Sequence, residues 1–419
     1  MRSFGAEWFG PGQLDWVSRI TVDVGNVRAA LDHTLARAED RSEAVGLVLA
    51  IAMYWPSVGS MQEGARWFLR ALSGSVDATP LALTTMVEAG WHAAMRSDRE
   101  SAGALAVRAT ELPAPDEAAE VRAFRARARA LVATTSQNQR TALRDHTQAL
   151  AEFALLGDPM RQVQHLGTMA QIEGWLGRHD AGLAHAAAGM DICDKHGERF
   201  ERFEIQGVQG NLLWQLGRLD EALVVVRDSL EHAPALRTTG VAHALQLAAR
   251  IYASTGEHQL AAVLRGALAQ MLADLGHTPL LWFAEGHAAS EASLREALGD
   301  AGFEAAYERG RDMNIPDAVA LVLGTRTPDP QQQARPERAE PSAQSVLSPR
   351  EHQVAELVAR GLSNKDIALE LVISRRTAEG HVANVMDKIG AHSRSQIVAW
   401  VAQQRPPTGA APPAGRDAN

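Results

Sequence analysis

Turn signals recur about every 40 residues through the first 324 residues, and this spacing restricts the possible folds more than any other feature. The signals are short Gly-, Ser- and charge-rich stretches near Ser57, Ser97, Gln137, Gly177, Gly217 and Gly256. The segments between them are rich in Ala and place apolar residues at helical spacing. Since two helices and a turn fill about 40 residues, each interval fits one helical hairpin. We therefore predict an all-α chain in which six or seven hairpins stack as a solenoid over residues 1–324.

The clearest hairpins share a local sequence pattern around the turn. A Leu-Gly pair ends the first helix, and an Ala four or five residues later lets the second helix approach closely; the pairs are Gly177 with Ala181 and Gly217 with Ala222, and Gly256 with Ala261 is a looser copy. This pattern resembles tetratricopeptide repeats, with a period longer than their usual length of about 34 residues. The resemblance implies a concave face that binds a peptide or a partner protein. Trp175 and Trp214, near two of the turns, are interpreted as core residues.

Residues 347–404 carry the signals of four short helices. Ser348, Ser363, Ser374 and Ser393 are the expected caps, and Gly361 and Gly390 end the first and third helices. About three residues join the second helix to the third, which is the spacing of a helix-turn-helix. The third helix, residues 374–390, is predicted to lie in a DNA major groove.

The stretch LSPREHQVAELVARGLSNKDIALELVISRRTAEGHVANVMDKIGAHSRSQIVAW resembles the DNA-binding domain of the LuxR family of bacterial regulators. This resemblance implies a four-helix helix-turn-helix domain, sequence-specific transcription regulation, and binding to double-stranded DNA as a homodimer. Two positions depart from the usual pattern: Ala378 replaces a β-branched residue and Gly380 a polar one. Gly380 costs about 1 kcal/mol relative to Ala inside a helix and has no side chain to reach a base.

Helix geometry and the resemblance together give the candidate DNA-binding residues. The start of the third helix offers free N–H groups to a phosphate, and it carries Ser374, Arg375, Arg376 and Thr377. Asn364 and Lys365, at the start of the second helix, are further phosphate candidates. The resemblance places base-edge contacts at Glu379, Gly380 and Ala383, backbone contacts at His381 and Lys388, and the pairing of two copies at Ile397, Val398, Trp400 and Val401.

Each of these interpretations has a plainer alternative. Arg375 and Arg376 can be ordinary solvated charges, and Glu379 can pair with either of them one turn back. His381 can be a packed histidine rather than a DNA contact. The whole C-terminal domain can also serve an interaction scaffold, or the output half of a split ATPase regulator, with little promoter binding of its own.

Net charge limits which part of the chain can touch DNA. The chain carries −9, whereas residues 348–404 and 405–419 each carry about +1, which leaves about −11 on residues 1–324. Phosphate repels the acidic part, so only the C-terminal region suits DNA. Residues 325–346 are expected to be a flexible Pro-rich linker, and residues 405–419 a disordered tail.

The remaining signals favour a regulator over an enzyme. The sequence contains no G-x-x-x-x-G-K-[ST] loop, no nucleophile elbow and no Cys/His metal-ligand spacing, so we expect no catalysis, cofactor or metal. The N-terminal forty residues resemble the segment after the ATPase in large actinobacterial LuxR-type regulators, which raises the expectation of a motor that is lost or lies upstream. A single Cys193, interpreted as a buried apolar residue, and the lack of a signal peptide or membrane span favour the bacterial cytoplasm.

Overall fold

The structure is a computed structural model, and its described residues are helical with no strand among them. The all-α fold class is thereby confirmed. The described residues are 7–37, 41–58, 60–73, 80–96, 98–113, 118–232, 239–275, 287–325, 347, 349–360, 362–371, 375–389, 394, 396–397 and 400–401. They form two compact units, residues 1–272 with 278–328 and residues 273–277 with 329–419. The predicted linker from residue 326 onward, and the predicted tail, lie outside the described residues.

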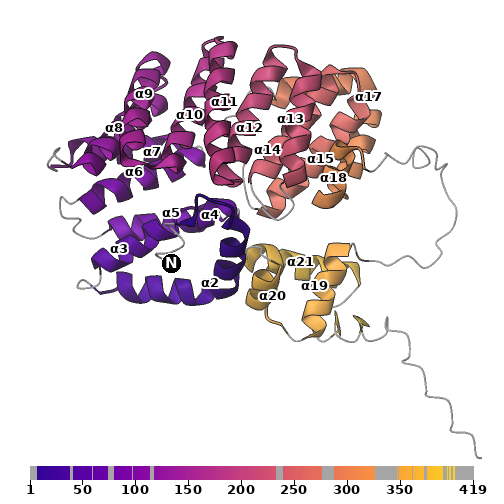
Figure 1. Ribbon diagram of the computed structural model, residues 1–419. Coiled ribbons are helices and arrows are strands. Elements are labelled where there is room, and N and C mark those ends of the chain that lie inside the picture. The colour runs from indigo at the N-terminus through magenta and orange to yellow at the C-terminus, as the bar shows by residue number, and fades with distance from the viewer. Residues whose placement is uncertain are drawn as a thin grey trace, which may run out of the picture. The chain divides into compact units, whose positions relative to one another are not determined.

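The first unit is an array of antiparallel helices (Figure 1). In chain order they are α2 (Gln13–Leu35), α3 (Arg41–Ala50), α4 (Tyr54–Ser57), α5 (Met61–Leu72), α6 (Pro80–Met95), α7 (Arg99–Glu111), α8 (Ala119–Thr135), α9 (Gln139–Leu156), α10 (Pro159–Trp175), α11 (His179–His196), α12 (Phe200–Gln215), α13 (Leu219–His232), α14 (Thr239–Ser254), α15 (His258–Leu275), α17 (His287–Arg311) and α18 (Ile315–Leu323). Consecutive helices from α6 to α14 pack on one another, which is the arrangement of stacked hairpins.

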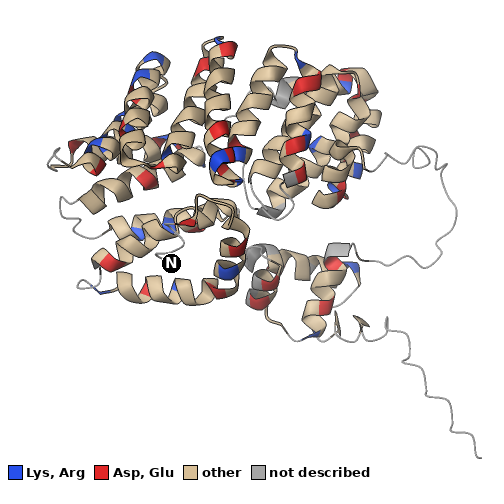
Figure 2. Cartoon of the chain, in the orientation of Figure 1, with Lys and Arg blue, Asp and Glu red and all other residues tan. Residues whose placement is uncertain are grey.

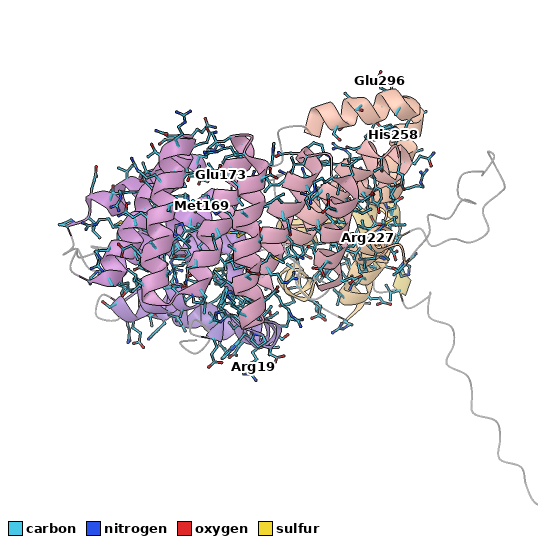
Figure 3. The ribbon with its side chains drawn as sticks, turned by 45° about the horizontal axis from the view of Figure 1, so that its top comes forward. Arg19, Met169, Glu173, Arg227, His258 and Glu296 are labelled. Atoms are coloured by element: carbon cyan, nitrogen blue, oxygen red, sulfur yellow. The ribbon has the colours of Figure 1, made fainter. Side chains whose placement is uncertain are left out.

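The predicted turns lie where the hairpins reverse. Gln137, Gly177, Gly217 and Gly256 have φ angles of 57°, 72°, 74° and 86°, the left-handed conformation that stops a helix. Ser57 ends α4, and Ser97 lies outside the described residues. At the Gly177 turn, Arg178 reaches back to Glu173 with a distance of 2.6 Å between Nε and Oε2. Glu173 and Met169, labelled in Figure 3, are one turn apart on α10 and both are buried.

Small residues let the two helices of each hairpin approach closely, at a regular position after the turn. That position is held by Ala102, Ala142, Gly182, Ala222 and Ala261, and all four alanines are fully buried. A Cβ at Gly182 would lie 2.9 Å from the Ala170 carbonyl oxygen, so only Gly fits there. The prediction was therefore correct at Ala222 and Ala261 but wrong by one residue at Ala181, which is exposed because Gly182 occupies the contact position.

A buried row of polar side chains runs along the first helix of four successive hairpins. We call it the polar ladder: Glu88, Arg127, Gln164 and Glu201, which are 2%, 3%, 7% and 4% exposed. Arg127 Nε lies 3.6 Å from Glu88 Oε1, Arg127 Nη2 donates to Gln164 Oε1 at 2.8 Å, and Gln164 Nε2 donates to Glu201 Oε1 at 2.6 Å. The same Gln164 amide contacts Met53 Sδ at 4.0 Å. The polar ladder is thus buried within the chain itself.

The two repeat tryptophans differ from their interpretation as core residues. Trp175 is 40% exposed at the C-terminal end of α10, so the core interpretation is wrong there. Trp214 is half-buried, donates from Nε1 to Ser254 Oγ at 3.1 Å, and has the Arg250 guanidinium 3.8 Å from its ring centroid. Cys193, in contrast, is fully buried as predicted.

Helix α18 closes the C-terminal end of the first unit. Asn314 caps its start by accepting from the Asp317 N–H at 2.8 Å, and Gly324 ends it with a φ of 72°. Arg227 of α13, labelled in Figure 3, donates from Nε to the Val322 carbonyl at 2.8 Å. Acidic and basic side chains are interspersed along the helices of this unit rather than gathered in one patch (Figure 2). Among the described helices, none combines the length and apolar character that a membrane crossing requires.

Candidate nucleic-acid interface

Three helices of the second unit surround a small apolar core. They are α19 (Pro349–Ala359), α20 (Asn364–Glu370) and α21 (Arg375–Lys388). The core takes the apolar residues that recur at helical spacing on each of them: Val354, Ala355, Leu357 and Val358, then Ile367, Ala368 and Leu371, then Ala378, Val382 and Val385. Helix α21 packs on both other helices, so its orientation is set by the core.

The capping signal of α20 works as the sequence indicates. Ser363 Oγ accepts from the Asp366 N–H at 3.2 Å, while Asp366 Oδ2 accepts from the Ser363 N–H at 3.1 Å and from its hydroxyl at 2.6 Å. This reciprocal pair fixes the first residue of the helix. The predicted caps Ser348, Ser374 and Ser393, and the link between α20 and α21, lie outside the described residues.

Helix α21 has one buried face and one exposed face. Ala378, Val382 and Val385 point into the core, because residues four and three positions apart share a face. Glu379, Gly380, Asn384 and Lys388 are exposed. Ala378 stands where a β-branched residue is usual. It is fully buried, and its small side chain fills less of the core than a β-branched one would.

Two of the predicted phosphate contacts already have partners within the unit. Lys388 Nζ lies 2.9 Å from Glu351 Oε2, whose side chain is nearly buried at the start of α19. Asn364 Oδ1 accepts from Arg394 Nη1 at 2.5 Å, and Arg394 Nη2 also donates to the Leu362 carbonyl at 2.5 Å. Arg394 thereby holds the entry to α20, and Lys388 ties α21 to α19.

The other predicted contacts divide into those whose side chains the structure describes and those it does not. Glu379 and Gly380 are exposed, and His381 is half-buried. A Cβ built on Gly380 meets no atom within 4 Å. Lys365, Arg375, Arg376, Thr377 and Ala383 lie within α20 and α21, but their side chains are outside the described set; Ser374 is outside it entirely.

The residues expected to pair two copies are largely used inside the domain. Ile397 is fully buried and Val401 is 7% exposed, both in the core with α19–α21. Both pack against their own chain, and their part in the pairing of two copies stays a prediction. Trp400 is half-buried and its ring meets His352 edge-on at 5.4 Å between centroids, while the Val398 side chain is not described.

Asn384, an exposed polar residue on the same face of α21 as Gly380 and Lys388, is not among the residues predicted from the sequence. Asn384 lies four residues after Gly380 and four before Lys388, so it belongs to the same stripe of α21. An asparagine amide can make the paired hydrogen bonds that identify adenine. Helical spacing alone would have found it. The Glu351–Lys388 pair, 37 residues apart, leaves no local signal. Among the described residues, no group of His, Cys, Asp or Glu is arranged to hold a metal ion.

The C-terminal part of the chain is similar to known bacterial regulators. Residues 345–401 match the model of the bacterial regulatory proteins of the luxR family. An HTH-type transcriptional regulator of Mycobacterium tuberculosis is 34% identical over 170 residues, which are 40% of this chain and 18% of that protein. The transcriptional regulatory protein FixJ of Bradyrhizobium diazoefficiens is 58% identical over 52 residues, 12% of this chain and 25% of FixJ. The oxygen regulatory protein NreC of Staphylococcus aureus is 35% identical over 60 residues, 14% of this chain and 28% of NreC.

The chain thus spans less than a fifth of the length of the mycobacterial relative. One solved structure, a STAND ATPase with a tetratricopeptide repeat sensor from Pyrococcus horikoshii, superposes with a TM-score of 0.42 at 14% identity, covering 69% of this chain and 47% of that one. This similarity is too low to support a conclusion about the first unit.

Proposed function

We propose that this protein is a DNA-binding transcription regulator in which α21 reads the major groove. One observation carries the proposal: α21 follows the short capped helix α20, buries Ala378, Val382 and Val385, and leaves Glu379, Gly380 and Asn384 exposed within a segment that matches the luxR-family model. Arg375, Arg376 and Thr377 at its first turn are the proposed phosphate anchors, together with Ser374, Asn364 and Lys365.

The proposed base-reading side of α21 carries few side chains long enough to reach a base, and this limits direct readout of the sequence. Gly380 and Ala383 reach little, so direct readout rests on Glu379, which accepts from a cytosine amino group, and on Asn384. DNA shape and the spacing of two half-sites supply the remainder, with the chain bound as a homodimer. His381 and Lys388 lie near the DNA backbone, and Lys388 must exchange Glu351 for phosphate to bind it.

Selection of bound fragments from a genomic library tests the proposal. The wild-type chain should enrich one sequence with two related half-sites. Arg375→Ala with Arg376→Ala should abolish that enrichment and reduce the slope of log affinity against log salt by about two, because two phosphate contacts are lost.

The matched control removes the same charge from the first unit. Arg108 and Arg140 are both exposed, and Arg108→Ala with Arg140→Ala should leave enrichment unchanged. Equal loss in both double variants would show a non-specific charge effect. No enriched sequence with the wild-type chain would favour the alternative, an interaction scaffold or the output half of a split ATPase regulator.

The helical repeats are the proposed sensor or protein-interaction module, in a cytoplasmic regulator without catalytic activity. Because the polar ladder is covered, a peptide or protein partner would use another side of the repeats or displace what covers it. Affinity capture of partner proteins with the wild-type chain and with Trp175→Ala tests this. Weaker capture by Trp175→Ala would show that the exposed turn at Trp175 contributes to partner binding.

A further inference from the structure

The residues before α2 bind a distant corner of the first unit. We call residues 7–13 the strap. It lies against the junction of α11 and α12: the Trp8 and Phe200 rings meet edge-on at 6.0 Å between centroids, and Phe9 meets His196 at 5.3 Å. Trp8 and Phe200 are both nearly fully buried. The strap therefore joins two segments that are about 185 residues apart in the chain.

Gln13 and Glu198 together cap the start of α12. Gln13 Oε1 accepts from the Arg199 N–H at 2.9 Å and from the Phe200 N–H at 3.3 Å, and its amide donates to Glu198. Glu198 itself accepts from the N–H groups of Phe200, Glu201 and Arg202 at 3.0–3.1 Å. An ordinary cap comes from the residue just before the helix, whereas half of this one is supplied by the strap.

Gly197 ends α11 and also lies against Pro11 of the strap. Gly157 and Gly197 end α9 and α11 with φ angles of 66° and 67°. A Cβ at Gly157 would meet nothing within 4 Å, whereas one at Gly197 would lie 3.3 Å from Pro11 Cβ. The two glycines therefore differ in one respect, which is the contact with the strap.

The corner that the strap closes holds two buried carboxyl groups, Glu198 and Glu201, which are 1% and 4% exposed. Burial raises the pKa of both carboxyl groups above the usual range. Glu201, the last member of the polar ladder, comes three residues after Glu198 and accepts from Gln164. Water would satisfy such groups, so opening this region recovers hydration that the closed form gives up.

We propose that the strap is a releasable closure of the first unit. In the closed form it completes the cap of α12 and keeps the Glu201 end of the polar ladder dry. In the released form the α11–α12 corner and that end of the ladder become accessible, which is the surface a partner of the repeats would have to compete for. This proposal does not depend on DNA binding by the second unit.

Cys193 is a native reporter of the release. It is the only cysteine in the chain, it is fully buried, and Phe9 of the strap packs against the apolar cluster that contains it. Burial raises the pKa of its thiol, so it should be unreactive while the strap is bound. The experiment measures the rate at which an aromatic disulfide reagent labels Cys193 in the intact native chain.

Gln13→Ala should raise the labelling rate about tenfold over the wild type, because it removes the strap's half of the α12 cap and leaves the backbone of α11 around Cys193 unchanged. Gln215→Ala, at the exposed C-terminal end of α12, is the control and should leave the rate unchanged. In the wild type the rate at low urea should depend weakly on urea, as expected for local opening. Equal rates in Gln13→Ala and Gln215→Ala, or rates that follow global unfolding in every variant, would overturn the proposal.

Discussion

At Gly380 the proposed recognition helix α21 carries no side chain, and the space around it is open. A Cβ there meets no atom within 4 Å, so larger residues fit without displacing anything. We expect Gly380→Asn to change the selected DNA sequence while altering stability by less than about 1 kcal/mol, since it adds a reading group and removes a flexible glycine. Selection of bound DNA and thermal unfolding measure the two effects. An unchanged sequence preference would show that this position does not face the bases.

The residue at the centre of the polar ladder should matter far more for stability. Arg127→Met removes the donor to the buried Gln164 Oε1 and one of the two guanidinium partners of Glu88, which keeps its ion pair with Arg161, so we expect a cost of about 1–3 kcal/mol. Arg129→Met, two residues along the same helix and only half-buried, is the control and should cost less than about 1 kcal/mol. Urea unfolding followed by circular dichroism measures both. Equal costs for the two variants would contradict a stabilising role of Arg127 in the polar ladder.

Helix α20 has only seven residues, so its cap contributes a large part of its stability. Ser363→Ala removes the acceptor for the Asp366 N–H, which costs about 1 kcal/mol. Amide exchange in α20 should therefore accelerate about fivefold, as measured by hydrogen exchange of the intact chain, while exchange in α10 stays unchanged. If the α20 amides kept their wild-type rates, the reciprocal cap would not be what fixes this helix.

Elements were predictable wherever a local signal defined them. The turns at Gln137, Gly177, Gly217 and Gly256, and the buried faces of α19–α21, follow from turn chemistry and helical spacing. The one-residue error at Ala181 arose because Gly and Ala both allow close approach, and the sequence does not say which one is used. Trp175 was misjudged because an aromatic residue at a helix end can lie outside the core. The strap and the Glu351–Lys388 pair join distant segments, so no local pattern reveals them.

For the whole molecule, buried ionisable groups predict a stability maximum at mildly acidic pH. Burial lowers the pKa of His92 and His243 from 6.5 to about 4 and that of His146 to about 3. The unfolded chain binds more protons at these sites, so stability falls as pH drops toward 4. Burial raises the pKa of Glu204 from 4.5 to about 7, so there the folded chain holds the proton and stability falls as pH rises from 4.5 through 7.

These opposite effects overlap between about pH 4.5 and 6.5. Below this range the free energy of unfolding falls because of the buried histidines, and above it because of Glu204. Glu204 Oε2 lies 3.8 Å from His243 Nδ1, and both side chains are neutral between these pH values. Glu204→Gln should remove a fall of a few kcal/mol in the free energy of unfolding between pH 5 and 8. Glu257→Gln, at an exposed turn, should leave the pH profile as it is. Parallel profiles for wild type and Glu204→Gln would show that this carboxyl ionises normally.

The strap also sets an order of events during synthesis of the chain. Gln13 leaves the ribosome about 185 residues before its partners at the start of α12. At translation rates of roughly 5–20 residues per second, the interval is roughly 10–40 seconds. During that time Phe200 and His196, the ring partners of Trp8 and Phe9, are still missing, and the hairpins before α12 form without Glu201. A nascent chain of this protein therefore presents an aromatic segment that chaperones can bind until α12 emerges.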